Sequence, residues 1–267
     1  NNIFPKLLGA YNYYKREIFR NVQIIEENKT RKEVDEQINE EQGENENQEK
    51  IPGQLKAILD SLDIYLEHSS NISNLCYGLI LVFFSLSQFV LEMIYLLENP
   101  DEDIFSFKKQ IRRGGGWDAL YKRVLDFNHD RKLEEMYYDL QKIKRKYRNP
   151  LAHGLNDEIS LLVPFLGKYL VPSSYHLLNN NLYHGLFQFE KEEANEIITS
   201  FDKFFVALES IDPFTCHMAY LKSGMNIPMD VNELKELKSR MTSCKEFNEY
   251  IERELYKQEK IINRELY

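Results

Sequence analysis

The sequence predicts a mostly α-helical protein, built as a helical bundle with a small β-hairpin insert and helical extensions at both ends. Apolar residues recur at gaps of three and four along most of the chain, which is the spacing of one helix face. One stretch, residues 75–97, is almost wholly apolar and long enough to be a central helix. With 267 residues, of which 43% are hydrophobic and 13% aromatic, the chain can bury a sizeable core.

Residues 1–25 are expected to form an N-terminal helix, and they lack the basic start and apolar run of a signal peptide. Residues 26–53 have a different composition. Between residues 26 and 50, ten acids and four bases give a net charge of −6, with very few apolar side chains among them. Such a segment cannot bury enough surface to offset the entropy of ordering it, so we expect an acidic flexible linker or loop with at most partial helix. A solvated spacer is the favoured interpretation, and an acidic interaction tail is the alternative.

Residues 54–211 are expected to form the bundle itself. Within it, a helix over about 54–68 precedes the apolar stretch at 75–97, which is long enough to span a bilayer. Gln88 and Glu92 lie inside that stretch, and a charged residue within a membrane span costs about 2.5 kcal/mol or more. We therefore predict a buried central helix in which Glu92 requires a partner. A membrane-associated protein is the weaker alternative.

After the central helix, residues 101–128 predict a polar connection with short helical pieces around Gly114-Gly115-Gly116. No Lys-Ser or Lys-Thr pair follows these glycines and no strand-like run precedes them, so they do not match a phosphate-binding loop. A turn with Trp117 anchoring its far side is the simpler interpretation.

Three further regions complete the predicted fold. The apolar faces of residues 130–148 and 190–211 predict two amphipathic helices. Between them, at about residues 168–189, strand-like runs flank a group of turn-prone asparagines and indicate a β-hairpin or a three-stranded β-insert. Residues 212–267 contain one or two amphipathic helices and form a C-terminal helical extension.

The cysteines and most histidines indicate no metal site. The three cysteines are widely spaced and odd in number, which excludes a disulfide scaffold and a four-cysteine zinc site and favours a reducing cytoplasm. His176 and His184 could face each other across the predicted hairpin, but two ligands without a nearby Cys or carboxylate are a weak zinc site. We expect neither a metal nor a cofactor.

The strongest functional signal is the segment KRKYRNPLAHG at residues 144–154. Proline disfavours helical geometry in the residue before it, so the preceding helix is expected to end at Asn149. Asn is a favoured N-cap and Pro a favoured first helical residue, so a second short helix is expected to start at Pro150. His153 then lies one turn into that helix, and the kink can bring it to the same side as Arg148.

A cation fixed beside an imidazole suits the cleavage of RNA. The imidazole of His153 can take a proton from a ribose 2′-hydroxyl or give one to the leaving oxygen. The guanidinium of Arg148 presents a fork of donors to the phosphate and stabilises charge in the transition state. Asn149 either caps the helix or orients a phosphate oxygen.

The segment RNPLAHG at residues 148–154 resembles the R-x4-H signature of HEPN domains, in which a polar residue, often Asn, follows the Arg. The resemblance covers roughly residues 54–211. It implies a four- or five-helix bundle that dimerises with two motifs facing one cleft, and many members are metal-independent ribonucleases of toxin–antitoxin, abortive-infection or CRISPR-linked systems. Carried onto this sequence, it implies that Arg148, His153 and Asn149 are catalytic. It also implies a homodimer, a toxin or antiviral defence effector, and an antitoxin or larger defence complex as partner.

The charge around the motif supports RNA as a partner. Residues 108–148 contain thirteen bases and six acids, a net charge of +7 within a chain of net charge −9. A basic surface attracts phosphate, so we predict RNA contacts for the four residues that precede Arg148. They are Lys144, Arg145, Lys146 and Tyr147. The plainer alternative is that these bases simply coat exposed helix faces.

Two functional hypotheses follow. The first is a cytoplasmic RNA endonuclease that cleaves without a metal and makes no contact with a membrane. The second is a non-catalytic HEPN-like module for dimerisation or RNA binding in a defence complex. The motif itself also has a structural alternative, a helix corner in which Arg148 pairs with an acid such as Glu92 and His153 satisfies a backbone carbonyl.

Overall fold

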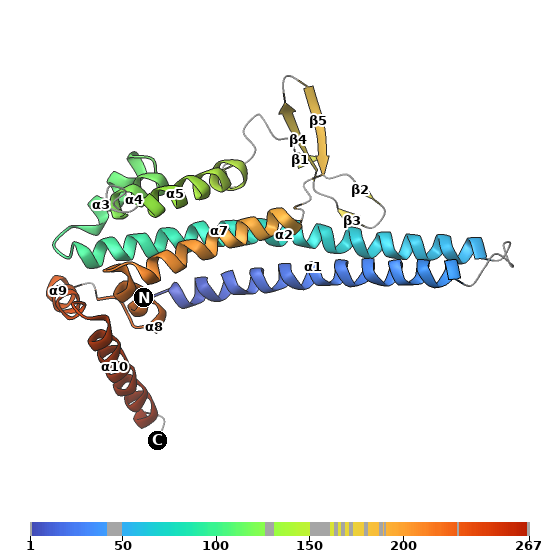
Figure 1. Cartoon of the computed structure of the whole chain (residues 1–267). Helices are drawn as coiled ribbons and strands as arrows, with labels where there is room; N and C mark the ends of the chain where they lie inside the picture. The colour runs from blue at the N-terminus through green and yellow to red at the C-terminus, as the bar shows by residue number, and fades with distance from the viewer. Residues whose placement is uncertain are drawn as a thin grey trace. The chain divides into compact units, whose positions relative to one another are not determined.

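The structure of the protein is a computed structural model of the chain (Figure 1). It describes residues 2–41, 50–125, 131–149, 189, 191–228 and 230–265, together with strand residues between 161 and 186 of which the backbone alone is described. The chain divides into two compact units. The first comprises residues 1–11, 81–144 and 199–267, and the second comprises residues 12–80 and 145–198.

Within the described residues the protein is mostly helical, as predicted. Its helices, in chain order, are α1 (Phe4–Glu41), α2 (Lys50–Glu98), α3 (Ile104–Arg113), α4 (Trp117–Val124), α5 (Arg131–Ile143), the π-helical turn η1 (Lys144–Arg148), α7 (Lys191–Ser210), α8 (Phe214–Ser223), α9 (Val231–Arg240) and α10 (Cys244–Glu265). The predicted helices at 130–148 and 190–211 correspond to α5 with η1 and to α7.

Short strands follow η1 along the chain. They are β1 (Leu161–Leu162), β2 (Phe165–Leu166), β3 (Tyr169–Leu170), β4 (Ser173–Leu178) and β5 (Asn181–Leu186). β4 pairs antiparallel with β1 and with β5, and β2 pairs antiparallel with β3. In the register of β4 and β5, His176 is opposite Tyr183 and His184 is opposite Tyr175. The two histidines are therefore not cross-strand partners, contrary to the expectation from the sequence.

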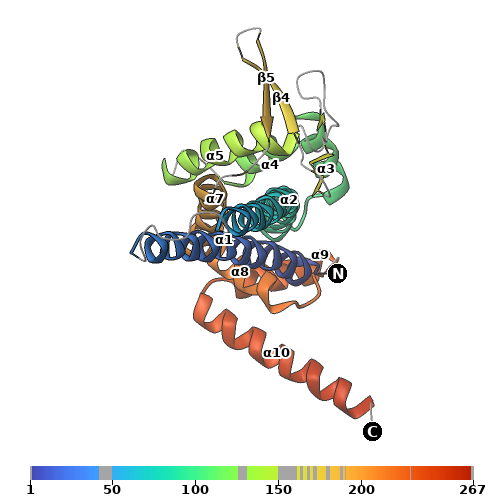
Figure 2. The same cartoon turned by 90° about the vertical axis from the view of Figure 1, so that its right-hand side faces the viewer.

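The core of the first unit lies between the C-terminal part of α2 and α7, helices that run beside each other in both views (Figures 1 and 2). Phe83 of α2 stacks on Phe201 of α7 with ring centroids 3.7 Å apart, and it meets Phe204 edge-on at 5.6 Å. The apolar face predicted for α7 is confirmed, since all seven of its side chains are buried. They are Ala194, Ile197, Ile198, Phe201, Phe204, Phe205 and Leu208.

The apolar stretch at residues 75–97 lies within α2. Among the described residues, one helical segment, Ile58–Glu98, is long and apolar enough to cross a membrane by length and composition, and 67% of its most apolar window is buried inside the structure. Glu92 has the partner that we predicted, because its Oε2 lies 2.8 Å from Nζ of Lys108 and its Oε1 accepts a hydrogen bond from Gln88. The charge within the stretch is thus paired inside the protein, as a buried central helix requires.

The acidic segment differs from the prediction, because residues 26–41 continue α1 as a helix where we expected a linker or loop. Two contacts in the second unit support this part of α1. Asn28 donates a hydrogen bond to Oγ of Ser61 in α2 at 3.0 Å, and Glu26 forms an ion pair with Lys191 at the start of α7. From composition alone, we expected the entropy cost of ordering this segment to keep it unfolded. The two contacts offset part of that cost.

The start of α2 also differs from the prediction. Residues 42–49 of the expected linker lie outside the described residues, and the two helices expected at 54–68 and 75–97 form one continuous helix. Pro52 is tolerated because it lies in the first turn, where a backbone N–H has no partner within the helix. Further along, the polar stretch between the two apolar runs is helical, and Ser73 donates its hydroxyl to the carbonyl four residues earlier, as serines inside helices often do.

The three glycines after α3 form the predicted turn. Gly115 and Gly116 have φ values of +116° and +62°, a region of backbone geometry that favours glycine. Trp117 then begins α4 and anchors the turn, as expected. Its ring is buried against Phe84 at 5.2 Å, and its indole N–H donates to Oγ of Ser87 at 2.9 Å.

The described part of the C-terminal extension contains two amphipathic helices, where one or two were predicted, and a further helix, α8, that was not predicted. The buried side chains on the apolar face of α9 are Leu234 and Leu237, and those on the apolar face of α10 are Phe247 and Ile251. α8 was missed because half of its ten residues are buried, so it lacks the polar face that makes helical periodicity visible.

The sequence excluded a disulfide scaffold, but it did not indicate the single disulfide that the described residues contain. Cys216 of α8 and Cys244 of α10 form a disulfide, with Cα atoms 5.2 Å apart, while Cys76 is buried and free. The partners are 28 residues apart and come from a set of three, so the sequence does not identify them as a pair. Because disulfides are typical of oxidising compartments, this pair does not support the cytoplasmic location expected from the cysteine count.

Glu98, the last residue of α2, joins three helices of the first unit. Its Oε1 lies 3.0 Å from Nε2 of the buried His217 in α8, off the line of an ideal hydrogen bond, and its Oε2 lies 3.0 Å from Nζ of Lys238 in α9. Lys238 also donates to the backbone carbonyl of Glu98, one of the acceptors that a helix end leaves unpaired. The contact with His217 and then that with Lys238 lower the pKa of Glu98 to about 2, against the opposing effect of burial.

The stability of this junction should depend on pH through Glu98. A carboxyl whose pKa is lower in the folded state stabilises the fold above its unfolded pKa of 4.5, and this contribution is lost as the pH falls toward about 2. We expect Glu98→Gln to lower the thermal unfolding midpoint at about pH 6, and the difference from the wild type to shrink below about pH 4.5. Glu236→Gln, at a carboxylate of α9 that is 64% exposed, is the control and should have little effect. If Glu98→Gln lowered the unfolding midpoint equally at about pH 6 and below about pH 4.5, the pH dependence could not be assigned to Glu98.

Candidate functional site

The helix that precedes the motif buries the face predicted from the sequence. The buried side chains are Leu133, Met136, Tyr137, Leu140, Ile143 and Tyr147. From Lys144 to Arg148 the chain is wound as a π-helix, which nothing in the spacing of the residues indicates. Such turns are rare and occur frequently at functional sites. Arg148 is therefore the last residue of a π-helical turn, and Asn149 after it is again α-helical.

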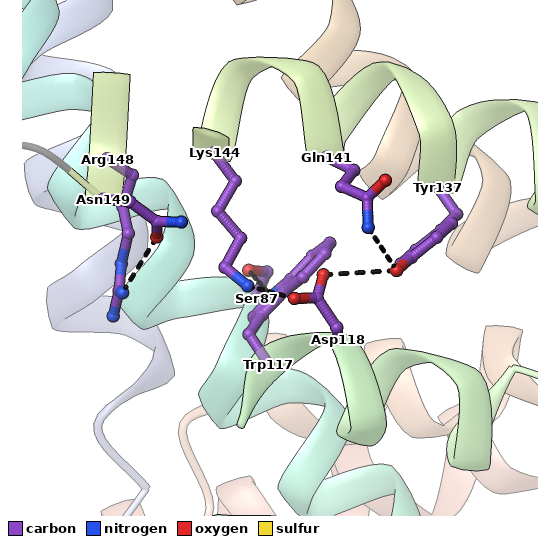
Figure 3. A network of polar contacts seen from close by, with 8 residues as sticks. All are labelled: Ser87, Trp117, Asp118, Tyr137, Gln141, Lys144, Arg148 and Asn149. Atoms are coloured by element: carbon purple, nitrogen blue, oxygen red, sulfur yellow. Dashed lines mark hydrogen bonds and ion pairs between the residues drawn. The ribbon is translucent and has the colours of Figure 1, made fainter. Parts of the chain in front are cut away.

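Arg148 is partly exposed, and its Nη1 lies 3.5 Å from the side-chain oxygen of Asn149 (Figure 3). A neutral amide at the limit of hydrogen-bond distance does not neutralise the guanidinium. Within the described part of the chain, no carboxylate forms an ion pair with Arg148. Glu92, the acid named as an example in the structural alternative for Arg148, is bound by Lys108 and Gln88.

His153 lies outside the described residues, as does the short helix expected to begin at Pro150. The pairing of His153 with Arg148 therefore stays a prediction. The alternative in which His153 satisfies a backbone carbonyl is equally untested.

Lys144 does not have the environment predicted for an RNA contact. Its side chain is buried, and its ammonium group pairs with Asp118 of α4 (Figure 3). The same ammonium lies 5.7 Å from the centre of the Trp117 ring, within reach of a cation–π interaction. Asp118 also accepts a hydrogen bond from Tyr137 at 3.3 Å, and Gln141 donates to Tyr137 at 2.7 Å. Lys144 is thus part of an internal network of the first unit rather than an exposed cation.

The other three predicted RNA contacts fall into two groups. Arg145 is exposed and the side chain of Lys146 is 60% exposed, as an RNA contact requires, whereas Tyr147 is buried. Nζ of Lys146 lies 2.7 Å from Oε1 of Glu193 on α7, and the hydroxyl of Tyr147 donates to the same oxygen. Arg145 and Lys146 are therefore the two of the four predicted contacts that present exposed side chains.

Glu193 was missed by sequence reasoning. It lies in the first turn of α7, where acids are common because they interact favourably with the helix N-terminus, so its position indicates only a helix start. Burial, and secondly the hydrogen bond to Glu193, raise the pKa of Tyr147 well above its usual value, so its hydroxyl remains a donor. Phe189 packs against Tyr147 with ring centroids 4.9 Å apart, and its N–H donates to Oγ of Ser73 in α2 at 3.2 Å. The turn before Arg148 is thereby tied to α7 and α2 within the second unit.

Among the described residues, no group of three His, Cys, Asp or Glu side chains is arranged to hold a metal ion. His68 lies 2.7 Å from the side-chain oxygen of Asn21, which accounts for one ring nitrogen. A cavity of about 280 Å³ in the second unit has Lys191 and Glu26 on its wall, and these two are already paired with each other.

No protein-family model matches this chain, and no curated protein and no solved structure is similar enough to count as a match. The resemblance to HEPN domains therefore rests on residues 148–154, and the mostly helical fold does not test it. The function of the protein is accordingly proposed from the surroundings of Arg148.

Lys144→Ala should destabilise the protein without affecting the RNA surface. Breaking a buried ion pair leaves Asp118 uncompensated, and because Asp118 keeps 31% exposure we expect a loss of about 2 kcal/mol in the free energy of unfolding, measured by urea denaturation. Arg145→Ala is the matched control, and its effect on stability should stay within about 0.5 kcal/mol. RNA binding, measured by fluorescence anisotropy with a labelled RNA, should show the opposite order. Arg145→Ala should bind RNA more weakly than Lys144→Ala. A stable Lys144→Ala that no longer binds RNA would restore the original prediction for Lys144.

Proposed function

We propose that this protein is a HEPN-type RNA endonuclease that needs no metal and acts as a toxin or defence effector. The cytoplasmic location expected from the sequence stays a prediction, which the Cys216–Cys244 disulfide does not support. The proposed fold is a HEPN-like bundle over residues 54–211 that carries a β-insert at about 168–189. RNA is the proposed partner, and the proposed catalytic residues are Arg148, His153 and Asn149.

The surroundings of Arg148 support this proposal. Arg148 is five residues before His153, the spacing of the R-x4-H signature. It is partly exposed at the end of η1, and no carboxylate among the described residues forms an ion pair with it. A guanidinium in such a position can offer two parallel donors to a phosphate.

The proposed reaction is attack of a ribose 2′-hydroxyl on the neighbouring phosphate. His153 takes the hydroxyl proton, the 2′-oxygen bonds to phosphorus, and the bond from phosphorus to the 5′-oxygen breaks. The leaving oxygen receives a proton from a general acid, so the products carry a 2′,3′-cyclic phosphate and a 5′-hydroxyl. Arg148 stabilises the charge on the phosphoryl oxygens, and Asn149 orients one of them.

A homodimer completes the proposed site. One motif supplies one histidine, whereas the reaction uses both a base and an acid. Two-fold symmetry would bring a second Arg148 and His153 to the same cleft, with an interface that uses the helix at 130–148 and the segment after it.

The non-catalytic module for dimerisation or RNA binding is the alternative function. The internal use of Lys144 and Tyr147 leaves fewer exposed groups for RNA next to the motif, and this observation favours the dimerisation form of the alternative. A deoxyribose at the cut site separates the two hypotheses, since it blocks 2′-hydroxyl chemistry and leaves binding largely intact.

The purified protein should cleave total RNA in the presence of EDTA. His153→Ala should abolish cleavage, and Arg148→Lys should reduce it more than about tenfold at an unchanged unfolding midpoint, because lysine keeps the charge but loses the planar fork. Arg145→Lys, at the exposed cation three residues earlier, is the matched control. Activity that disappears in EDTA and returns with magnesium would exclude the mechanism, and a fully active His153→Ala would exclude His153.

A shared site should also show complementation between chains. A mixed dimer of Arg148→Ala and His153→Ala chains, purified through two different tags, is expected to regain some cleavage that neither homodimer shows. Sedimentation should give a dimer at micromolar concentration. A monomer with intact cleavage would contradict the shared site.

A further inference from the structure

We propose that Glu193 is a positioning residue for the cleavage reaction, which holds Arg148 for the phosphate by binding Tyr147 and Lys146. This inference rests on the proposed function. Glu193 does not touch the reacting atoms in this scheme. It acts on the turn from whose last residue the guanidinium projects.

One carboxylate oxygen of Glu193 serves two consecutive residues of η1. Its Oε1 lies 2.7 Å from Nζ of Lys146 and accepts a hydrogen bond from the hydroxyl of Tyr147. The lysine ammonium also lies 4.8 Å from the centre of the Tyr147 ring, so the three groups contact one another. Because these two residues directly precede Arg148, the contacts restrain the turn at its functional end.

The two contacts differ in strength. Lys146 is 60% exposed, and an ion pair of that exposure contributes little to stability. Tyr147 is buried, with its ring against Phe189, and a buried hydroxyl that loses its acceptor is costly. The hydrogen bond from Tyr147 is therefore the main constraint through which Glu193 acts.

The winding of η1 makes this constraint relevant to Arg148. A π-helical turn holds one residue more than an α-helical turn, so a return to α winding would rotate Arg148 to another direction. The weak contact with Asn149 cannot hold the guanidinium in place by itself. A displacement of about 1 Å at a group that binds the reacting phosphate can cost about 100-fold in rate.

Four single variants, one double variant and two readouts test the proposal. Glu193→Ala removes the acceptor, whereas Glu193→Gln keeps an acceptor oxygen in the same place. Tyr147→Phe removes the donor and keeps the ring against Phe189. Glu192→Ala removes the exposed neighbouring carboxylate and is the control. The readouts are kcat and KM on an RNA with one cut site, and hydrogen exchange of the backbone amides of residues 144–149.

We expect Glu193→Ala to lower kcat about 100-fold with little change in KM, and to accelerate amide exchange in residues 144–149. Glu193→Gln should recover most of the lost rate, which a loss of packing alone would not allow. Tyr147→Phe should behave like Glu193→Ala, and the double variant should be no worse than either, because both changes remove the same bond. Glu192→Ala should match the wild type in both readouts.

Unchanged amide exchange in Glu193→Ala would overturn the inference whatever the activity. A normal kcat in Glu193→Ala would also overturn it, provided that the wild type cleaves RNA and Arg148→Ala does not. Absence of cleavage by the wild type would instead overturn the proposed function and the catalytic part of this inference, while the exchange data would still decide whether Glu193 holds the turn. Tyr147→Phe supplies both readouts if Glu193→Ala does not fold.

Discussion

Burial of the apolar stretch at residues 75–97 is the constraint on which the rest of the fold depends. Most of its leucine, isoleucine and phenylalanine side chains are buried, and burying each contributes about 1.5–3 kcal/mol. The neighbouring elements cover it largely with aromatic rings. In the first unit, Phe84 meets Trp117 of α4 at 5.2 Å and lies against α7. In the second unit, Tyr77 meets Phe189 at 5.1 Å. These ring contacts help determine which elements pack on the central helix.

Apolar burial does not by itself fix where each neighbour sits along α2, and the polar groups of that helix supply this information. Each buried polar group needs a partner, because leaving it unpaired costs about 1–3 kcal/mol. The partners come from different elements, so each contact sets the position of one of them. Ser73 accepts from Phe189 before α7, Ser87 accepts from Trp117 of α4, Glu92 pairs with Lys108 of α3, and Glu98 contacts His217 of α8 and Lys238 of α9. Much of the stability thus comes from apolar contacts, and the arrangement of the neighbours from a few polar ones.

Sequence periodicity predicted the helices with one apolar face and failed where a contact distant in sequence decided the outcome. The acidic part of α1 is helical because α2 and α7 supply partners that composition does not reveal. The expected exposure of Lys144 was wrong because Asp118, 26 residues earlier, takes its charge into the interior. The helix break predicted at Asn149-Pro150 stays a prediction, because Asn149 is still helical and Pro150 lies outside the described residues. The contact of Glu193 with Tyr147 spans 46 residues and depends on packing, so no local pattern could indicate it.

The net charge of +7 between residues 108 and 148 overstates the basic surface near the motif. Two of its bases are paired with acids outside the segment, which the count over residues 108–148 does not include. The pairs are Lys108 with Glu92 and Lys146 with Glu193. The pair of Lys144 with Asp118 is already part of the count, but it takes one cation into the interior. A cation that is paired within the protein cannot neutralise an RNA phosphate and release its counterions. Each such pair therefore lowers the affinity for RNA that charge alone can supply. If RNA is the substrate, its recognition must then depend on a small site around Arg148, where the geometry of one turn matters more than the charge of a whole face.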